Sequence, residues 1–126
     1  MANRGEIACR ILRACKEAGH PTVAVCAPND AGSLFTEMAD TVVMLEGETI
    51  AETYLDQNQI IQAALTTGAT AIHPGFGFLS ERAEFATAVE AAGLTWIGPS
   101  ALAIEKMGDK MTARQTMRAA GVPVIP

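Results

Sequence analysis

The sequence lacks the features that define several classes of protein. No apolar run approaches the roughly 18 residues that span a bilayer, and Arg4 and Glu6 stand where a secretory signal needs an apolar segment. Basic residues are also few, because 9 Lys and Arg face 14 Asp and Glu, for a net charge of -5. Nucleic acids are held by clustered Lys and Arg. The balance therefore argues against a nucleic-acid-binding surface.

Metal-binding and redox motifs are equally scarce. The three cysteines, Cys9, Cys15 and Cys26, have no CxxC spacing, so neither a disulfide framework nor a cysteine zinc site is expected, and a reducing compartment is favoured. His20 and His73 are too few and too far apart in the sequence to indicate a metal cluster. His20 lies between Gly19 and Pro21, which is typical of a turn.

What the sequence has is an alternation of helical and strand patterns. A composition of 49% hydrophobic and 18% charged residues is that of a folded domain, and 126 residues make at most one modest domain or a piece of a larger one. Apolar spacing and turn residues predict the following elements. Helices are expected over 5–18, 57–67, 81–92, 100–106 and 109–120, strands over 22–26, 41–45, 70–73 and 95–97, loops over 27–36 and 46–55, and an extended segment over 122–125.

This alternation predicts an α/β fold in which a parallel sheet is flanked by helices on both faces. Asp56 is the expected N-cap of its helix, with Gln59 completing a capping box, and Ser80 is the expected cap of the helix over 81–92. Periodicity also predicts which side chains face the core. They are Ile7, Ala8, Ile11, Leu12, Cys15, Ala18, Ile60, Ile61, Ala64, Leu65, Phe85, Ala86, Val89 and Ala92.

Ligands of such folds gather at the carboxyl ends of the strands. That rule selects the loops at 29–30, 73–78 and 98–99, and the loop at 3–5 would join them if a strand preceded it. The run from Gly75 to Ser80 is a near match to GxGxxG, so its backbone N–H groups could approach a polar ligand. The alternative is a tight turn that needs glycine torsions.

Other candidate residues keep two interpretations each. Lys110 begins a helix, where it would suit phosphate oxygens or simply be solvated. Arg10, Arg13 and Glu17 share one helix face, which is either solvated or a polar interface. His73 ends a strand beside the glycine loop, as a structural or a catalytic histidine. No GxxxxGK[ST] motif and no defensible Ser/His/Asp or Cys/His arrangement is found.

Several motifs together resemble the biotin carboxylase family, and the resemblance covers essentially all of the chain. The opening Ala2-Asn3-Arg4-Gly5-Glu6-Ile7-Ala8 with Arg10-Ile11, the run His73 to Glu81, and the blocks Trp96-Ile97-Gly98-Pro99, Met107-Gly108-Asp109-Lys110 and Gly121-Val122-Pro123 follow the family's order and spacing. The resemblance implies the N-terminal, pre-ATP-grasp domain over 1–126, with a three-layer Rossmann-like sheet.

The resemblance also implies a reaction and its participants. A biotin carboxylase uses ATP, Mg2+ and bicarbonate, through carboxyphosphate, to carboxylate N1′ of biotin on a carrier protein. It serves acetyl-CoA carboxylase of fatty acid biosynthesis and related carboxylases. The implied partners are the rest of the enzyme chain, the biotin carboxyl carrier protein, a carboxyltransferase and a second copy in a homodimer, with no nucleic acid and no membrane. The implied location is the cytoplasm, or the mitochondrial matrix in a eukaryote.

Carried over residue by residue, the resemblance assigns roles to a few positions. Lys110 matches a lysine that contacts ATP, and Phe76 and Gly77 match a loop that borders the biotin site, where tyrosine is common in place of Phe76. The face formed by Arg10, Arg13 and Glu17 matches positions near a dimer interface. His73 matches a family histidine with no assigned step. Phe35 and Arg82 stand where the family often has histidine and asparagine.

Two departures from the family shape the expectations. The ATP-grasp part, with its metal and catalytic residues, would lie beyond Pro126, so no catalytic residue and no activity are expected for these 126 residues alone. An apolar strand before Ala2 is also absent, so the isolated chain is expected to be marginally stable or completed by a partner. The alternatives are another ATP-grasp ligase, such as a carbamoyl-phosphate synthetase, a non-catalytic interaction module that dimerises through the Arg10 face, and, more distantly, a dinucleotide-binding domain.

Overall fold

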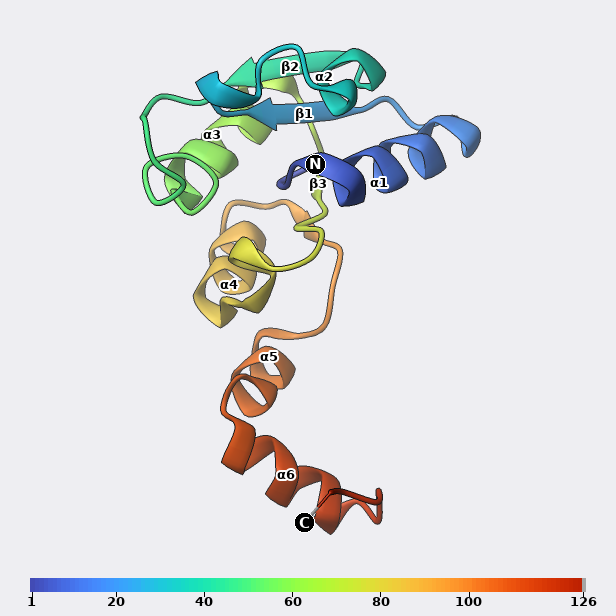
Figure 1. Ribbon diagram of the computed structural model, residues 1–126, viewed down its shortest axis with the longest axis vertical. Helices are drawn as coiled ribbons and strands as arrows, with labels where there is room; N and C mark the ends of the chain where they lie inside the picture. Colours follow the sequence, from blue (N-terminus) through green and yellow to red (C-terminus); the bar gives the residue numbers. More distant parts are fainter. Residues whose placement is uncertain (126) are drawn as a thin grey trace.

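The computed structural model describes residues 1–125, and Pro126, the last residue of the expected domain, lies outside them. Helices and strands alternate along the chain (Figure 1). In order they are α1 (Gly5–Glu17), β1 (Val23–Cys26), the 3-10 turn η1 (Pro28–Asp30), α2 (Leu34–Met38), β2 (Thr41–Met44), α3 (Gln57–Thr67), β3 (Ala71–Ile72), the 3-10 turn η2 (Phe78–Glu81), α4 (Ala83–Ala91), β4 (Thr95–Trp96), α5 (Ala101–Gly108) and α6 (Lys110–Ala119).

The strands form two parallel pairs, which confirms the predicted α/β class with helices flanking parallel strands. In one pair β1 runs beside β2, with Val23 opposite Thr41 and Cys26 opposite Met44. In the other, β3 runs beside β4, with Ile72 opposite Trp96. Because parallel neighbours need a long crossover, α2 and α4 lie in the connections within each pair and α3 lies between the pairs.

The first two residues connect the two strand pairs. The Met1 ammonium donates to the Val23 carbonyl at 2.6 Å, and the Met1 carbonyl accepts from the Val25 N–H at 3.5 Å. On the other side, the Ala2 N–H donates to the His73 carbonyl at 2.9 Å. Met1 and Ala2 therefore lie between β1 and β3. This is the place, beside β1 on one side and β3 on the other, where the first strand of the family would end.

Strand β1 is covered on both faces, as expected of a buried parallel strand. Val25 points into a large apolar cluster with α3 and α4, while its neighbours Ala24 and Cys26 point into a smaller one. The smaller cluster is completed by Ala8, Leu12 and Phe35 of α1 and α2. Of the predicted core positions, Ala8, Leu12, Ile60, Ile61, Ala64, Phe85, Ala86 and Val89 are buried.

Some of the predicted core positions are wrong, and so is the predicted capping box. Leu65 is 45% exposed and Ala63 is buried in its place, because α3 is rotated slightly from the face that the pattern suggested. Ala18 is exposed, since it lies past the end of α1. Asp56 caps α3 by accepting from the N–H groups of Asn58 and Gln59. Gln59 does not complete the capping box, because its amide bonds the carbonyls of Glu46 and Glu52 instead.

Two segments fold differently from the sequence prediction. The expected loop over 27–36 contains the start of α2. A helix this short is not stable by itself, and burial of Phe35, which is 1% exposed, stabilises it through tertiary packing. Ser80 does not cap α4. It lies in η2, where burial of Leu79 draws the chain inward, so that α4 begins only at Ala83.

The last two helices extend away from the strands (Figure 1). Ser100 and Asp109 cap α5 and α6 by accepting backbone N–H bonds, the latter from Thr112 at 2.7 Å. A hydrogen bond from the Thr112 hydroxyl, reinforced by this backbone bond, lowers the pKa of Asp109. No residue of α6 is buried. Across residues 1–125, no helix is both long enough and apolar enough to cross a membrane.

We expect the stability of the 126-residue chain to rise between pH 6 and 8. Burial lowers the pKa of the Met1 ammonium from 8.0 to about 6, so in this window the unfolded chain binds more protons than the folded one. The free energy of unfolding should then increase with pH, by at most about 3 kcal/mol. Urea unfolding at several pH values, followed through Trp96 fluorescence, measures it.

The control is the same chain acetylated at Met1. Acetylation keeps an N–H that can donate to Val23 but removes the charge, so the rise between pH 6 and 8 should disappear. Burial also lowers the pKa of His73 from 6.5, which leaves a weaker dependence of the same sign at lower pH. An equal rise in both chains would contradict the assignment to the Met1 ammonium.

Candidate functional site

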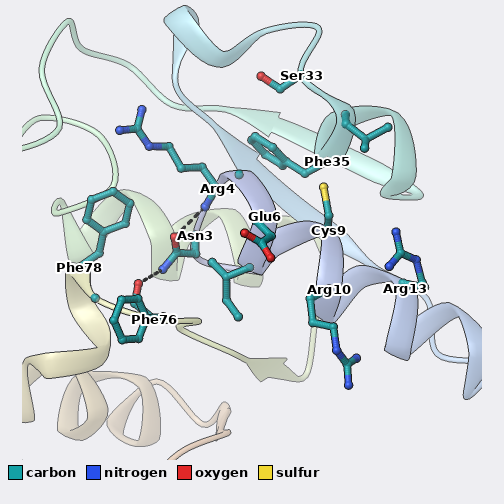
Figure 2. A pocket seen from close by; sticks show the side chains of 14 residues that line it. Asn3, Arg4, Glu6, Cys9, Arg10, Arg13, Ser33, Phe35, Phe76 and Phe78 are labelled. Carbon is teal, nitrogen blue, oxygen red and sulfur yellow. Dashed lines mark hydrogen bonds between the residues drawn. The ribbon is translucent and has the colours of Figure 1, made fainter.

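An open depression of about 1100 Å³ lies where the start of α1, α2 and the loop after β3 meet (Figure 2). It brings together predicted site residues from two separate segments. Phe76 and Gly77 line one side, and Arg10 and Arg13 of α1 line another. Glu17, the last residue of α1, is exposed and does not line the depression. The remaining lining residues are Asn3, Arg4, Gly5, Glu6, Ile7, Cys9, Ser33, Leu34, Phe35 and Phe78.

The side chain of Asn3 holds the glycine loop in place. It is buried, and its amide nitrogen donates to the carbonyls of Pro74 at 2.9 Å and Phe76 at 2.7 Å. Its amide oxygen accepts from the Arg4 N–H at 2.8 Å. The side-chain amide therefore donates two hydrogen bonds and accepts one, which satisfies a polar group that would otherwise be costly to bury. Asn3 thus joins the start of α1 to the loop that presents Phe76.

His73 acts within the same loop rather than toward a ligand. Its Nδ1 accepts from the Gly75 N–H at 3.0 Å, so this nitrogen carries no proton. Burial lowers the pKa of His73, which favours the neutral ring that this bond requires. Both observations favour the structural interpretation of His73.

Gly75 is required by the turn itself. Its φ is +71°, and a Cβ built there would lie 2.8 Å from the Asn3 side chain. Its N–H is occupied by His73, and the Ser80 N–H is occupied by the Gly77 carbonyl. These contacts favour the tight-turn interpretation of the GxGxxG-like run. What the turn exposes is Phe76, whose side chain is 80% accessible.

Beside the loop lies a cluster formed by Arg4, Asp30, Tyr54 and Phe78, hereafter the Arg4 cluster. The Tyr54 hydroxyl donates to Asp30 at 2.6 Å and accepts from the Ala27 N–H at 3.0 Å. The rings of Tyr54 and Phe78 are stacked with centroids 5.4 Å apart. The Arg4 guanidinium lies 5.7 Å from each ring centroid and 3.3 Å from the Asp30 carboxylate.

The cluster fixes the protonation state of Tyr54. Burial, reinforced by the bond to Asp30, raises the pKa of Tyr54 far above its ordinary value. The phenol is therefore a permanent donor to the carboxylate. Sequence reasoning selected the loops that hold Arg4 and Asp30, but it missed Tyr54. The only signal was that this is the single tyrosine of the chain, and it lies in an irregular segment where periodicity says nothing.

The structure separates the other predicted positions from the depression. Lys110 is the first residue of α6, is exposed, and does not line it. The loop at Gly98 and Pro99 lies elsewhere, where the Pro99 carbonyl accepts from the Trp96 indole at 2.8 Å. Within residues 1–125, no group of three or more His, Cys, Asp or Glu side chains is placed to hold a metal ion.

Comparisons with known proteins agree on one family. The family described as "Biotin carboxylase, N-terminal domain" matches residues 1–104. The chain is 52% identical over all 126 residues to the mitochondrial methylcrotonoyl-CoA carboxylase subunit alpha of Oryza sativa, covering 17% of that protein. It is 49% identical over the same length to biotin carboxylase 1 of Bacillus subtilis, covering 28% of it.

Solved structures give the same result. The biotin carboxylase domain dimer of the Hydrogenobacter thermophilus 2-oxoglutarate carboxylase, in complex with MgADP, ADP and bicarbonate, superimposes with a TM-score of 0.92 at 47% identity. The match covers 99% of this chain and 27% of that one. The chain thus spans less than a third of each of these relatives.

We expect Gly75→Ala to cost more stability than Gly68→Ala, although both glycines have nearly the same positive φ. Gly68, at the end of α3, has φ +74° and no atom within 4 Å of a built Cβ, so only the left-handed backbone penalty of about 1–2 kcal/mol applies. At Gly75 the contact with Asn3 should add a further penalty of about 1–3 kcal/mol. Urea unfolding of the two variants measures the difference, and equal losses would show that Asn3 moves aside freely.

Proposed function

The chain belongs to the biotin carboxylase N-terminal domain family, and we propose that it forms this part of an enzyme that carboxylates carrier-bound biotin with ATP and bicarbonate. The observation that carries the proposal is the continuous match: about half of all residues are identical to named biotin carboxylases, with no gap in coverage. Another ATP-grasp ligase and a dinucleotide-binding domain are not supported, because the family match includes the glycine loop and the start of α1.

The reaction proceeds in two steps in the enzyme we propose. Bicarbonate attacks the terminal phosphate of ATP, which releases ADP and forms carboxyphosphate. Carboxyphosphate breaks down to carbon dioxide and phosphate, the phosphate takes the N1′ proton of biotin, and N1′ bonds to the carbon of carbon dioxide. Mg2+ would neutralise the phosphate charge, but no described group of residues in this chain fits a metal ion. We therefore assign the metal ligands to the rest of the enzyme.

The residues of this chain would bind and orient rather than catalyse. Phe76 and Gly77 would border the biotin site, because the loop exposes the Phe76 ring beside an open depression. Phenylalanine in place of the common tyrosine keeps the aromatic face and removes a hydroxyl. Lys110 would contact ATP, since it begins α6, where its ammonium is exposed and near the helix N-terminus.

The face formed by Arg10, Arg13 and Glu17 would lie at a homodimer interface. All three side chains are exposed on α1, and Arg10 and Arg13 extend the interface to the depression. The named Hydrogenobacter structure is a dimer of biotin carboxylase domains. A carrier protein bearing biotin and a carboxyltransferase would complete the assembly, in the cytoplasm or the mitochondrial matrix. The final acceptor would be an acyl-CoA, acetyl-CoA of fatty acid synthesis among them, or a 2-oxo acid.

We also propose the finer architecture, a three-layer Rossmann-like sheet of the pre-ATP-grasp type over residues 1–126. The burial of β1 on both faces supports it, as does the position of Met1 and Ala2 between β1 and β3.

The test of the function is an assay of the full-length protein that contains these residues. It should hydrolyse ATP only with bicarbonate, faster with biotin, and should form carboxybiotin from labelled bicarbonate. The 126-residue chain by itself should do neither, because it holds no metal-ligand group among residues 1–125. A full-length protein that binds the carrier without turning over ATP would instead support a non-catalytic interaction module.

Lys110→Gln in the full-length protein should raise the KM for ATP. A lost charge-assisted hydrogen bond to phosphate is worth about 1.5–3 kcal/mol, or roughly ten- to hundredfold. The KM for biotin should stay unchanged, because Lys110 does not line the depression beside Phe76. Lys106→Gln is the matched control, since Lys106 is an exposed lysine one helix earlier. Equal effects of the two substitutions would contradict the assignment of Lys110.

A further inference from the structure

We propose that Arg4 is a positioning residue. It holds the loop that presents Phe76 and Gly77 in its observed conformation, and it does so through the stacked rings of Tyr54 and Phe78. The inference rests on the proposed function, because the loop matters only if it borders the biotin site. It also makes a separate claim about what holds the loop, and that claim can be tested on its own.

The backbone at Phe78 needs such support. Among residues 1–125, Phe78 is the only non-glycine residue with a positive φ, at +49°. It follows Gly77, whose φ is +66°, so two successive residues have a positive φ. A side chain in this conformation persists only where its surroundings hold it. The loop would otherwise relax toward an extended path, and Phe76 would move with it.

The Arg4 cluster provides that support from three sides. The Phe78 ring is stacked on Tyr54 with an angle of 2° between the planes. Tyr54 cannot shift, since it is fully buried and its hydroxyl is bonded to both Asp30 and Ala27. The Arg4 guanidinium is equidistant from the two ring centroids, at 5.7 Å, where a cation is attracted to aromatic faces.

Asp30 keeps the guanidinium in this place. Arg4 Nη1 lies 3.3 and 3.4 Å from the two carboxylate oxygens, and the same carboxylate accepts from Tyr54. One carboxylate therefore orients both the cation and the buried ring. The preceding residue, Asn3, bonds the Pro74 and Phe76 carbonyls at the other end of the loop. Two adjacent residues at the start of α1 thus hold the loop on both sides of Phe76.

The arrangement assigns Arg4 a role in substrate affinity without contact to the substrate. Arg4, Phe76 and Phe78 line the same depression (Figure 2), but the loop carries Phe76 at its exposed tip. Loss of Arg4 should loosen the loop and weaken biotin binding, while ATP binding through distant residues is unaffected. A merely structural arginine would instead lower the amount of folded protein without changing the KM for any substrate.

The experiment compares Arg4→Gln, Arg4→Lys and Phe78→Leu in the full-length protein, with Arg82→Gln as the matched control. Arg82 is also an arginine beside a carboxylate, 3.9 Å from Glu84, but that pair is exposed and outside the depression. Hydrogen exchange of the peptide over 74–81 reports the loop. In Arg4→Gln, the Gly75 and Ser80 amides should exchange about five- to tenfold faster, from the loss of one cation–π contact and one ion pair.

The same variants are then assayed with free biotin. Arg4→Gln should raise the KM for biotin about fivefold, with kcat and the KM for ATP within about twofold of the parent. Arg4→Lys keeps the charge but not the planar group, so its KM for biotin should lie between those of the parent and Arg4→Gln. The double variant Arg4→Gln with Phe78→Leu should be no worse than either alone, because both act through one contact. Arg82→Gln should change nothing.

The outcomes separate the two claims. Unchanged loop exchange in both Arg4→Gln and Phe78→Leu overturns the inference about Arg4, whatever the kinetics. Faster loop exchange with an unchanged KM for biotin supports the role of Arg4 in holding the loop and overturns its role in affinity. The Phe76→Ala variant then tests whether Phe76 borders the biotin site. If the ring contacts biotin, its removal should raise the KM for biotin. A full-length parent that does not carboxylate biotin overturns the proposed function, and the exchange data still decide what holds the loop.

Discussion

The structure depends on the placement of its first two residues between β1 and β3. Strand β1 runs on one side of them and β3 on the other, and backbone hydrogen bonds from Met1 and Ala2 reach both sides. Since the strand pairs have no direct ladder with each other, these bonds set the spacing of the two halves. Asn3 and Arg4 then emerge at the carboxyl edge of the strands, where side chains from α1, η1 and the glycine loop converge.

The convergence explains why one short segment controls so much of the candidate site. Asn3 satisfies the loop carbonyls, and Arg4 lies over the two stacked rings. Neither role requires conformational change, because both side chains are fixed by partners from separate elements. These contacts hold the loop where it is buried, and among residues 73–80 only Phe76 is exposed. Such an arrangement suits the role proposed for Phe76 at the border of a biotin site, because the loop is ordered before any ligand arrives.

Basic side chains outnumber acidic ones around the depression, although the chain as a whole is acidic. The net charge is -5, yet Arg4, Arg10 and Arg13 line the depression, with Glu6 as its one acidic residue. Arg4 is neutralised by Asp30, whereas the ion pairs found among residues 1–125 include neither Arg10 nor Arg13. A locally cationic edge on an acidic domain favours contact with acidic groups of a partner or a second copy. This is consistent with the interface proposed for the Arg10 face.

The sequence by itself determined the alternation of helices and strands, the parallel class, many of the buried helix positions, and the family. Apolar spacing and Asp56 as a cap are local signals, so they can be interpreted without knowing which residues pack opposite them. The tertiary structure alone decided what is made by distant partners. The helix at Phe35 forms because its ring is buried against α1, and Ser80 is not a cap because Leu79 is drawn inward. Likewise, Tyr54 becomes part of the site only when Asp30, Arg4 and Phe78 meet around it. No periodicity encodes those contacts, since they join residues up to 74 positions apart in the chain.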